Sequence, residues 1–222
     1  MARAKEQPQD ANAPPITRHP LLLYYNMGRR YRPPGLLLFL LGPFLVLPRF
    51  VGELDHGIVD PDSLAVIGAI VTLVGLGLLL LSVVAKRRSY VQCRPDVLEI
   101  RTPFYRSLVS YSRIKQVLSV QVSQLFPRES LKGRGKPLMT PLLGMTAVEV
   151  YMTSWPAPKN RLMRYMGKYL FSPRADAWVF IVPNYSVLIR QLEVARQRRD
   201  ERARAQASGY QDPFERLQYR KK

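Results

Sequence analysis

The chain has 222 residues, and 34 lysines and arginines against 16 aspartates and glutamates give it a formal net charge of +18. That length allows a membrane anchor and one domain of ordinary size, but it excludes two large domains. The single cysteine excludes an internal disulfide and a cysteine-built metal site. The positive excess predicts an anionic partner, and for a membrane protein the nearest one is the layer of lipid headgroups.

The chain begins with two polar segments. Residues 1–20 are rich in proline, alanine and polar residues and lack apolar periodicity, so we expect a disordered tail. Residues 21–33 mix leucines, tyrosines and arginines, which is typical of a segment lying at a membrane surface. Pro33 and Pro34 are expected to break the chain before the first long apolar run.

Two apolar runs predict transmembrane helices over residues 34–52 and 64–85. The second run has no charged residue and is long enough as a helix to cross the hydrocarbon core of a bilayer. The first is uncharged only from Gly35 to Pro48, which leaves a re-entrant or interfacial segment as the alternative to a full span. Arg49 lies near the far end, where its side chain can extend to the interface, so we interpret the run as a span.

The charges around these runs predict their orientation. Residues 53–63 form an acidic loop without lysine or arginine, whereas basic clusters lie on the outer side of both runs. By the positive-inside rule the loop is external and both termini are cytoplasmic, as in a multi-pass protein of the cell or inner membrane. Small residues occur along the second run, at Ala65, Gly68, Ala69, Thr72, Gly75 and Gly77. They allow close approach of another helix, either the first helix or one from a different protein.

From Ser89 onward the apolar period changes to two, which predicts half-buried strands. The alternating apolar positions are Leu98 and Ile100, then Leu118, Val120 and Val122, then Val148, Val150 and Met152. Residues 176–182 predict a last, buried strand, followed by a helix whose apolar face is Leu188, Leu192 and Ala195. Residues 200–222 lose apolar spacing, so we expect a charged flexible tail.

Two stretches give the chain a family resemblance. Residues 111–117 (YSRIKQV) lead into a strand, and residues 172–174 (SPR) precede a strand and a final helix. In these respects residues 88–199 resemble the pleckstrin-homology-like (PH-like) domain of certain bacterial membrane proteins. The resemblance implies a membrane α + β fold: a two-helix transmembrane hairpin, then a PH-like antiparallel β-barrel or sandwich with one C-terminal helix. Members of this family are generally non-enzymatic modules that bind lipids or proteins.

No set of residues in the sequence predicts catalysis. His19 is expected in the disordered tail and His56 in the external loop, so the two histidines would lie on opposite faces of the membrane. The acidic residues near Asp60 are interpreted as a solvated turn rather than a cation site. Residues 132–137 (KGRGKP) lack the Gly-Lys-Ser/Thr ending of a phosphate-binding loop. We therefore expect no enzyme activity, no cofactor and no metal.

Basic residues near the predicted membrane surface are the candidate lipid-headgroup contacts. They are Arg29, Arg30, Arg32, Lys86, Arg87, Arg88, Lys132, Arg134, Lys136, Arg161, Arg164 and Lys168. The loop at residues 128–141 could instead be a merely solvated surface. Residues 160–171 fit an interfacial helix with one basic and one apolar stripe, or alternatively strand core.

The sequence thus predicts a non-enzymatic, membrane-anchored adaptor or scaffold. Its PH-like domain would face the cytoplasm and meet anionic lipid headgroups, a protein partner or a second copy of the chain. The alternative is a small accessory or assembly subunit of a larger integral membrane complex. Nucleic acid is not an expected partner, because only the net charge and the arginine-rich tail favour it.

Overall fold

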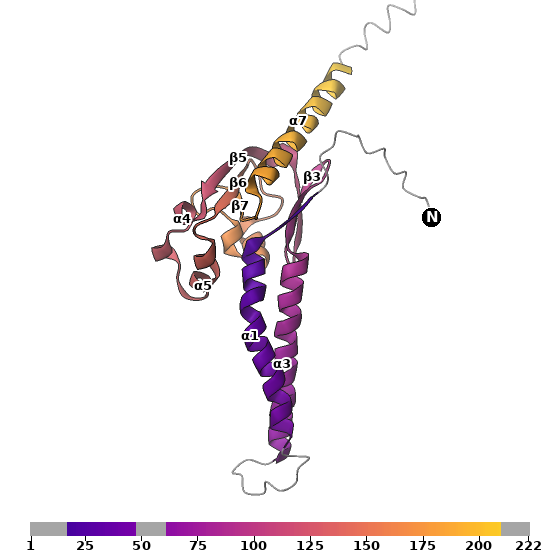
Figure 1. Ribbon diagram of the computed structural model, residues 1–222. Helices are drawn as coiled ribbons and strands as arrows, with labels where there is room; N and C mark the ends of the chain where they lie inside the picture. Colours follow the sequence, from indigo (N-terminus) through magenta and orange to yellow (C-terminus); the bar gives the residue numbers. More distant parts are fainter. Residues whose placement is uncertain (1–16, 48–60, 210–222) are drawn as a thin grey trace, which may run out of the picture.

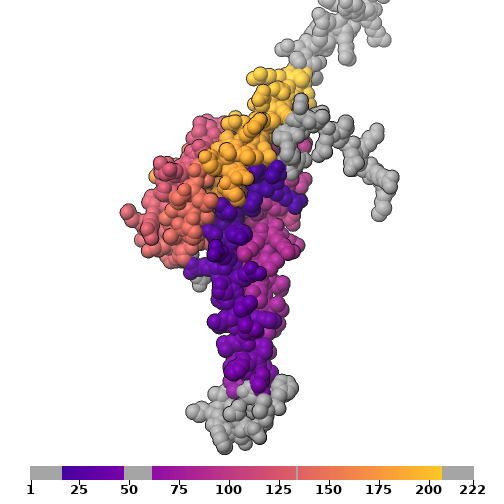
Figure 2. Space-filling view, in the orientation of Figure 1, coloured from indigo at the N-terminus to yellow at the C-terminus, as the bar shows by residue number. Residues whose placement is uncertain are grey.

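The computed structural model describes residues 17–47 and 61–209. Two long helices, α1 (Leu22–Val46) and α3 (Pro61–Arg88), lie side by side and extend from a domain of strands and shorter helices (Figure 1). Figure 2 shows the two helices as a stalk beneath that domain. The expected combination of helices, antiparallel sheets and one C-terminal helix is confirmed at this level.

Small residues spaced seven apart line the contact between α1 and α3. They are Gly28, Gly35 and Gly42 on α1, and Gly68, Gly75 and Ser82 on α3. Residues seven apart lie on one face of a helix, so each series forms a stripe. A Cβ atom on Gly75 would lie 2.4 Å from the backbone nitrogen of Phe39, which shows how closely the backbones approach.

The helix that approaches the small residues of α3 is therefore α1. A Cβ atom on Gly68 would lie 2.6 Å from the carbonyl oxygen of Gly42, and Ser82 Oγ donates a hydrogen bond of 2.5 Å to the carbonyl of Gly28. By contrast, Ala69 is exposed and a Cβ atom on Gly77 would meet nothing within 4 Å. Of the two partners that the sequence left open, the first helix is confirmed.

The expected break at Pro33 and Pro34 does not occur. Helix α1 runs through both prolines and through Pro43, so residues 21–33 form its first part rather than a separate interfacial segment. The two prolines are exposed. Close contacts of Gly28 and Gly35 with α3 hold the axis on either side of them, which compensates for the hydrogen bonds that proline cannot donate.

Among the described residues, α3 is the one helix long and apolar enough to cross a membrane, over Asp62–Arg88. The first predicted span, residues 34–52, is not confirmed by these criteria. Helix α1 carries arginines in its first half, and residues 48–52 lie outside the described part of the chain. Arg49, His56 and most of the predicted acidic loop also lie outside it, since the description resumes at Pro61.

The strands form two antiparallel sheets of four and three strands. The first sheet has the order β1 (Arg18–Pro20), β2 (Tyr90–Cys93), β3 (Val97–Arg101) and β4 (Arg106–Ser110). The second has the order β5 (Ile114–Gln121), β6 (Thr146–Met152) and β7 (Ala177–Phe180). Every neighbouring pair is antiparallel.

The prediction of a disordered tail is wrong for residues 18–20. These residues form β1, which pairs with β2 and brings His19 opposite Val91. The His19 side chain is buried, and its Nε2 lies 2.8 Å from Oε1 of Gln191. The partner strand β2 lies far along the chain from β1. The local composition of residues 1–20 therefore did not reveal this pairing.

Short helical turns replace part of the predicted strand and loop structure. They are η1 (Tyr111–Arg113), α4 (Val122–Leu125), η2 (Arg128–Ser130), η3 (Gly133–Gly135), α5 (Lys136–Met139), η4 (Thr140–Leu142), α6 (Lys159–Met166) and η5 (Lys168–Leu170). Val122 thus begins α4 instead of ending a strand. Of the two interpretations of residues 160–171, the helix is the correct one for residues 160–166.

The C-terminal helix α7 (Tyr185–Gly209) is longer than expected. The prediction of a flexible tail from residue 200 is wrong up to residue 209, and residues 210–222 lie outside the described part. Arginine, glutamate, alanine and glutamine favour a helix even without an apolar face, and Gln197 bonds Glu201 one turn later at 3.0 Å.

Burial follows the predicted alternation only in part. Leu98, Ile100, Val148 and Val150 are fully buried as expected. Glu99, which lies between two of them and would face solvent in a half-buried strand, is buried too. Leu118, predicted to face the core, is 38% exposed. It lies on β5, an edge strand whose register shifts between Ile114 and Gln116, and this shift changes which side chains face inward.

The start of α1 is joined to the domain by three hydrogen bonds. The amides of Leu21 and Leu22 donate to the carbonyls of Ser89 and Ile181 at 3.2 and 2.9 Å. The hydroxyl of Tyr24 donates to the carbonyl of Met166 in α6. The folded domain therefore includes residues 18–24 as well as the predicted residues 88–199.

Candidate lipid-headgroup site

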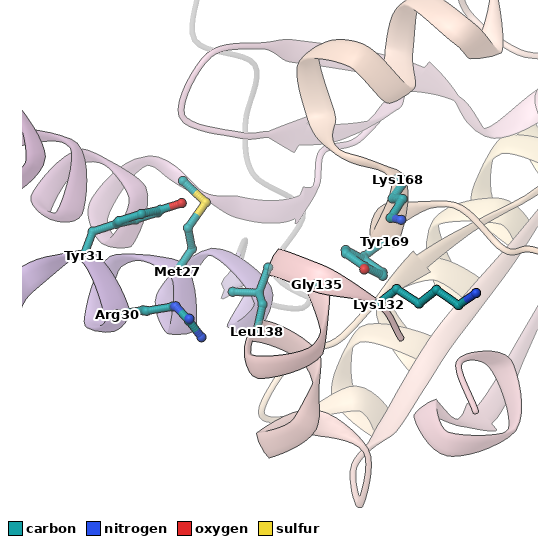
Figure 3. A pocket seen from close by; sticks show the side chains of 8 residues that line it. All are labelled: Met27, Arg30, Tyr31, Lys132, Gly135, Leu138, Lys168 and Tyr169. Carbon is teal, nitrogen blue, oxygen red and sulfur yellow. The ribbon is translucent and has the colours of Figure 1, made fainter. Parts of the chain in front are cut away.

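A groove of about 670 Å³ lies between α1 and the short helices of the domain. Its lining comes from three separate segments: Met27, Arg30 and Tyr31 on α1; Lys132, Gly135 and Leu138 at η3 and α5; and Lys168 and Tyr169 at η5 (Figure 3). We call this cavity the basic groove. It exists only because residues 132–138 fold back against α1.

Buried apolar side chains hold these segments in place. Leu131 and Met139, which flank the loop, are buried in the core, so the basic residues between them are kept at the surface beside α1. Gly135 makes room for Tyr169, because a Cβ atom at Gly135 would overlap the Tyr169 hydroxyl at 1.6 Å. The Tyr169 ring also packs edge-on against Phe126, with 5.6 Å between centroids.

The groove combines positive charge with an apolar floor. Arg30, Lys132 and Lys168 supply three cations, and its lining contains no acidic residue. In Figure 3, Arg30 lies on one side of Gly135 and Leu138, while Lys132, Lys168 and Tyr169 lie on the other side. An elongated ligand with an anionic group and an apolar part matches this arrangement.

The register of the two long helices sets the height of Arg30 along the stalk. Gly28 lies against Ser82 and Lys86, and Gly35 lies against Leu78 and its neighbours. Arg30 falls between these two contacts and is therefore level with the uncharged part of α3, about one helical turn further along the stalk than Lys86.

The other predicted contacts do not line the basic groove. Lys86 lies over the ring of Tyr25, with 4.9 Å from Nζ to the centroid. Exposed side chains are Arg29 and Arg32 on α1, Arg87 and Arg88 at the end of α3, Lys136 on α5, and Arg161 and Arg164 on α6. The side chain of Arg134 lies outside the described part of the structure. The structure therefore brings three of the twelve predicted residues into one cavity.

The sequence reasoning missed the apolar half of the groove. Met27, Tyr31, Leu138 and Tyr169 were not predicted as site residues, although each lies within four residues of a basic residue that was. An aromatic or long apolar residue inside a basic loop is the signal that could have identified them.

Other ionisable groups in the domain have structural roles. The Glu99 carboxylate is 1% exposed and pairs with the Nε atoms of Arg94 at 2.5 Å and Arg106 at 2.6 Å. Burial raises the pKa of the Cys93 thiol to about 12, which makes this cysteine a poor nucleophile. Within residues 17–47 and 61–209, no group of three or more histidine, cysteine, aspartate or glutamate side chains could hold a metal ion.

No protein-family model, no curated protein and no solved structure matches this chain. The likeness to PH-like domains therefore stays a prediction from sequence motifs. The candidate site is therefore identified from its geometry, which places three cations and an apolar floor beside α1.

Proposed function

We propose that this protein is a non-enzymatic, membrane-anchored adaptor that binds anionic lipid headgroups in its basic groove. In this proposal α1 and α3 form a transmembrane hairpin, both chain ends are cytoplasmic, and the hairpin holds a PH-like domain at the membrane surface. The observation that carries the proposal is the position of Arg30, Lys132 and Lys168 in one cavity beside α1, at the end of the stalk that meets the domain.

Exposed apolar surface on the stalk supports a membrane location. Only 17% of the most apolar part of α3 is buried, whereas a core helix of a soluble domain would be mostly covered. The α1 side chains that face away from α3 are also large and apolar, including Leu37, Leu40 and Phe44 with at least 61% exposure. A bilayer covers such a surface, and Lys86, Arg87 and Arg88 end it with positive charge.

The chemistry of the groove supports an anionic phospholipid as its ligand. Anionic lipid headgroups in the groove would be attracted by the three cations, each worth about 1 kcal/mol near an anionic surface. The glycerol backbone and the first methylenes of the acyl chains would pack on Met27, Tyr31 and Leu138. Arg30 then has an anion beside it at the depth where an unpaired cation would be costly.

The alternative, an accessory subunit of a larger complex, has less support. Its main motivation was the series of small residues on α3, which could receive a helix from another protein. Gly68, Gly75 and Ser82 are used instead in the contact with α1. No further feature of the described residues favours that function.

Lipid retention measured on the intact protein tests the proposal. The full chain, purified from membranes in mild detergent, is examined by native mass spectrometry for bound phosphatidylglycerol and phosphatidylethanolamine. We expect retained phosphatidylglycerol in the unmodified protein. The triple variant Arg30→Gln, Lys132→Gln, Lys168→Gln should lower its affinity on the order of 100-fold, from about 3 kcal/mol in total.

A second triple variant controls for net charge alone. Lys115→Gln, Arg190→Gln and Arg204→Gln remove three exposed cations from β5 and α7, away from the groove. This control should retain phosphatidylglycerol as the unmodified protein does. Equal loss in both triple variants would mean that the basic groove is not the lipid site.

A further inference from the structure

A tight turn between β3 and β4 presents an aromatic side chain to the outside. Phe104 is 67% exposed, which is the largest exposure of any large apolar side chain described outside α1 and α3. Its backbone is held firmly: the Thr102 amide donates to the Tyr105 carbonyl at 2.8 Å, and the Thr102 hydroxyl bonds the same carbonyl at 3.0 Å. The exposure of Phe104 is thus a fixed feature of the turn.

The sheet register places this turn level with the end of α3. Strand β2 begins at Tyr90, two residues after α3 ends at Arg88, and Tyr90 pairs with Arg101 on β3. Because β3 runs antiparallel to β2, the chain returns toward α3 as it leaves β3. Arg101 also pairs with Arg106 across the turn, so the turn that holds Phe104 lies at the end of the sheet where α3 leads into β2.

Helix α6 brings a second aromatic side chain to the same place. Tyr165 is 46% exposed and stacks on Tyr105 of the turn, with 5.8 Å between ring centroids. The hydrogen bond from Tyr24 to the carbonyl of Met166 holds α6 where the stalk joins the domain. Arg161 and Arg164 on α6 are exposed near these rings, so aromatic and basic side chains occur together.

We infer that Phe104 and Tyr165 insert into the headgroup layer of the bilayer and form a second lipid contact that fixes the orientation of the domain. The inference rests on the proposed function, because it requires α3 to span the membrane. The bilayer is the fitting partner because the two rings lie level with the basic end of the apolar stalk, where aromatic rings and arginines are favoured.

Site-specific quenching by lipid tests this contact. The full chain with Cys93→Ser receives one cysteine at a time, Phe104→Cys, Leu108→Cys or Val83→Cys, and each carries an environment-sensitive fluorophore. All three native side chains are exposed. The proteins are reconstituted into phosphatidylcholine and phosphatidylglycerol vesicles that contain lipids spin-labelled near the headgroup. Leu108 is the matched control, because it pairs with Glu99, further from α3 than Arg101.

We expect quenching at position 104 to be at least threefold stronger than at position 108. Equal quenching at these two positions overturns the inference while leaving the proposed function intact, provided that the label at position 83 in α3 is quenched. Absence of quenching at position 83 contradicts the membrane-spanning hairpin and therefore the proposed function as well. Tryptophan fluorescence of each labelled protein verifies that it is folded.

Discussion

Glu99 illustrates how single residues in this domain combine burial with charge. The carboxylate is almost completely removed from solvent, while the two arginines that pair with it are about half exposed. A buried carboxylate without such partners would be strongly unfavourable. The pairs also link three places in the first sheet, because Arg94 lies after β2, Glu99 on β3 and Arg106 on β4.

Replacement of Glu99 should therefore destabilise the domain. We expect Glu99→Ala to lower the free energy of unfolding by about 2 kcal/mol, because it leaves a cavity and two arginines without their shared partner. Urea unfolding of the full chain in mild detergent, followed by tryptophan fluorescence, measures this. Glu129→Ala, at an exposed position on η2, is the control and should change the free energy by less than about 0.5 kcal/mol. Equal stability of the two variants would contradict this role of Glu99.

At the scale of elements, the stalk is defined by two stripes of small residues. Gly28, Gly35 and Gly42 meet Ser82, Gly75 and Gly68 in antiparallel order. Without side chains between them, the two backbones come close enough for Ser82 to bond the Gly28 carbonyl. This contact also sets the depth of Arg30 against α3, so the geometry of the basic groove depends on it.

Two glycines on α3 provide a matched test of this packing. Gly75→Leu should separate the helices and lower the free energy of unfolding by about 2 kcal/mol or more, because its side chain would overlap the backbone of Phe39. Gly77→Leu adds the same side chain two residues later, where space is open, and should not destabilise the protein. Thermal unfolding in detergent compares the two variants. A lower melting temperature for Gly77→Leu than for Gly75→Leu would refute the described helix contact.

Elements with a strong local pattern were predictable from the sequence. The uncharged run in α3, its basic end and the apolar alternation in β3 and β6 each depend on neighbouring residues alone. β1 was not predictable, because residues 18–20 become a strand only through pairing with β2. The continuity of α1 through Pro33 and Pro34 likewise depends on glycine contacts with α3.

The site was predictable as a set of residues but not as a cavity. Arg30 was identified from a basic cluster beside a predicted transmembrane run, Lys132 from the basic loop at residues 128–141, and Lys168 from the basic stripe of residues 160–171. Their meeting depends on how residues 132–138 fold against α1, and this requires burial of Leu131 and Met139 in the distant core. Such long-range packing leaves no periodic signal in the loop itself.

At the scale of the whole molecule, the domain is built from residues on both sides of the helix pair. β1 and the start of α1 precede the stalk, whereas the other strands follow it. Hydrogen bonds from Leu21 to Ser89 and from Leu22 to Ile181 join the two parts at the point where the stalk begins. The start of the stalk is therefore part of the folded domain, and α1 supplies one side of the basic groove.

This arrangement predicts how the domain behaves without its stalk. A fragment of residues 88–209 lacks β1 and the buried side chains of Leu21 and Leu23, so it should unfold without a cooperative transition. A second protein joins residues 17–27 to residues 86–209 by a short glycine-serine linker, which is feasible because Gly28 and Lys86 are in contact. It should unfold cooperatively. Circular dichroism during heating compares the two, and cooperative unfolding of the shorter fragment would contradict this account.

The most direct test of the central claim locates a lipid headgroup on the protein in a bilayer. The full chain is reconstituted with phosphatidylglycerol that carries a photoactivatable headgroup, and cross-linked peptides are identified by mass spectrometry. We predict cross-links concentrated at residues 27–31, 132–138 and 168–169, and few with a phosphatidylcholine probe of the same design. Cross-links that avoid these segments, or that do not distinguish the two lipids, would contradict the proposal that the basic groove binds anionic headgroups.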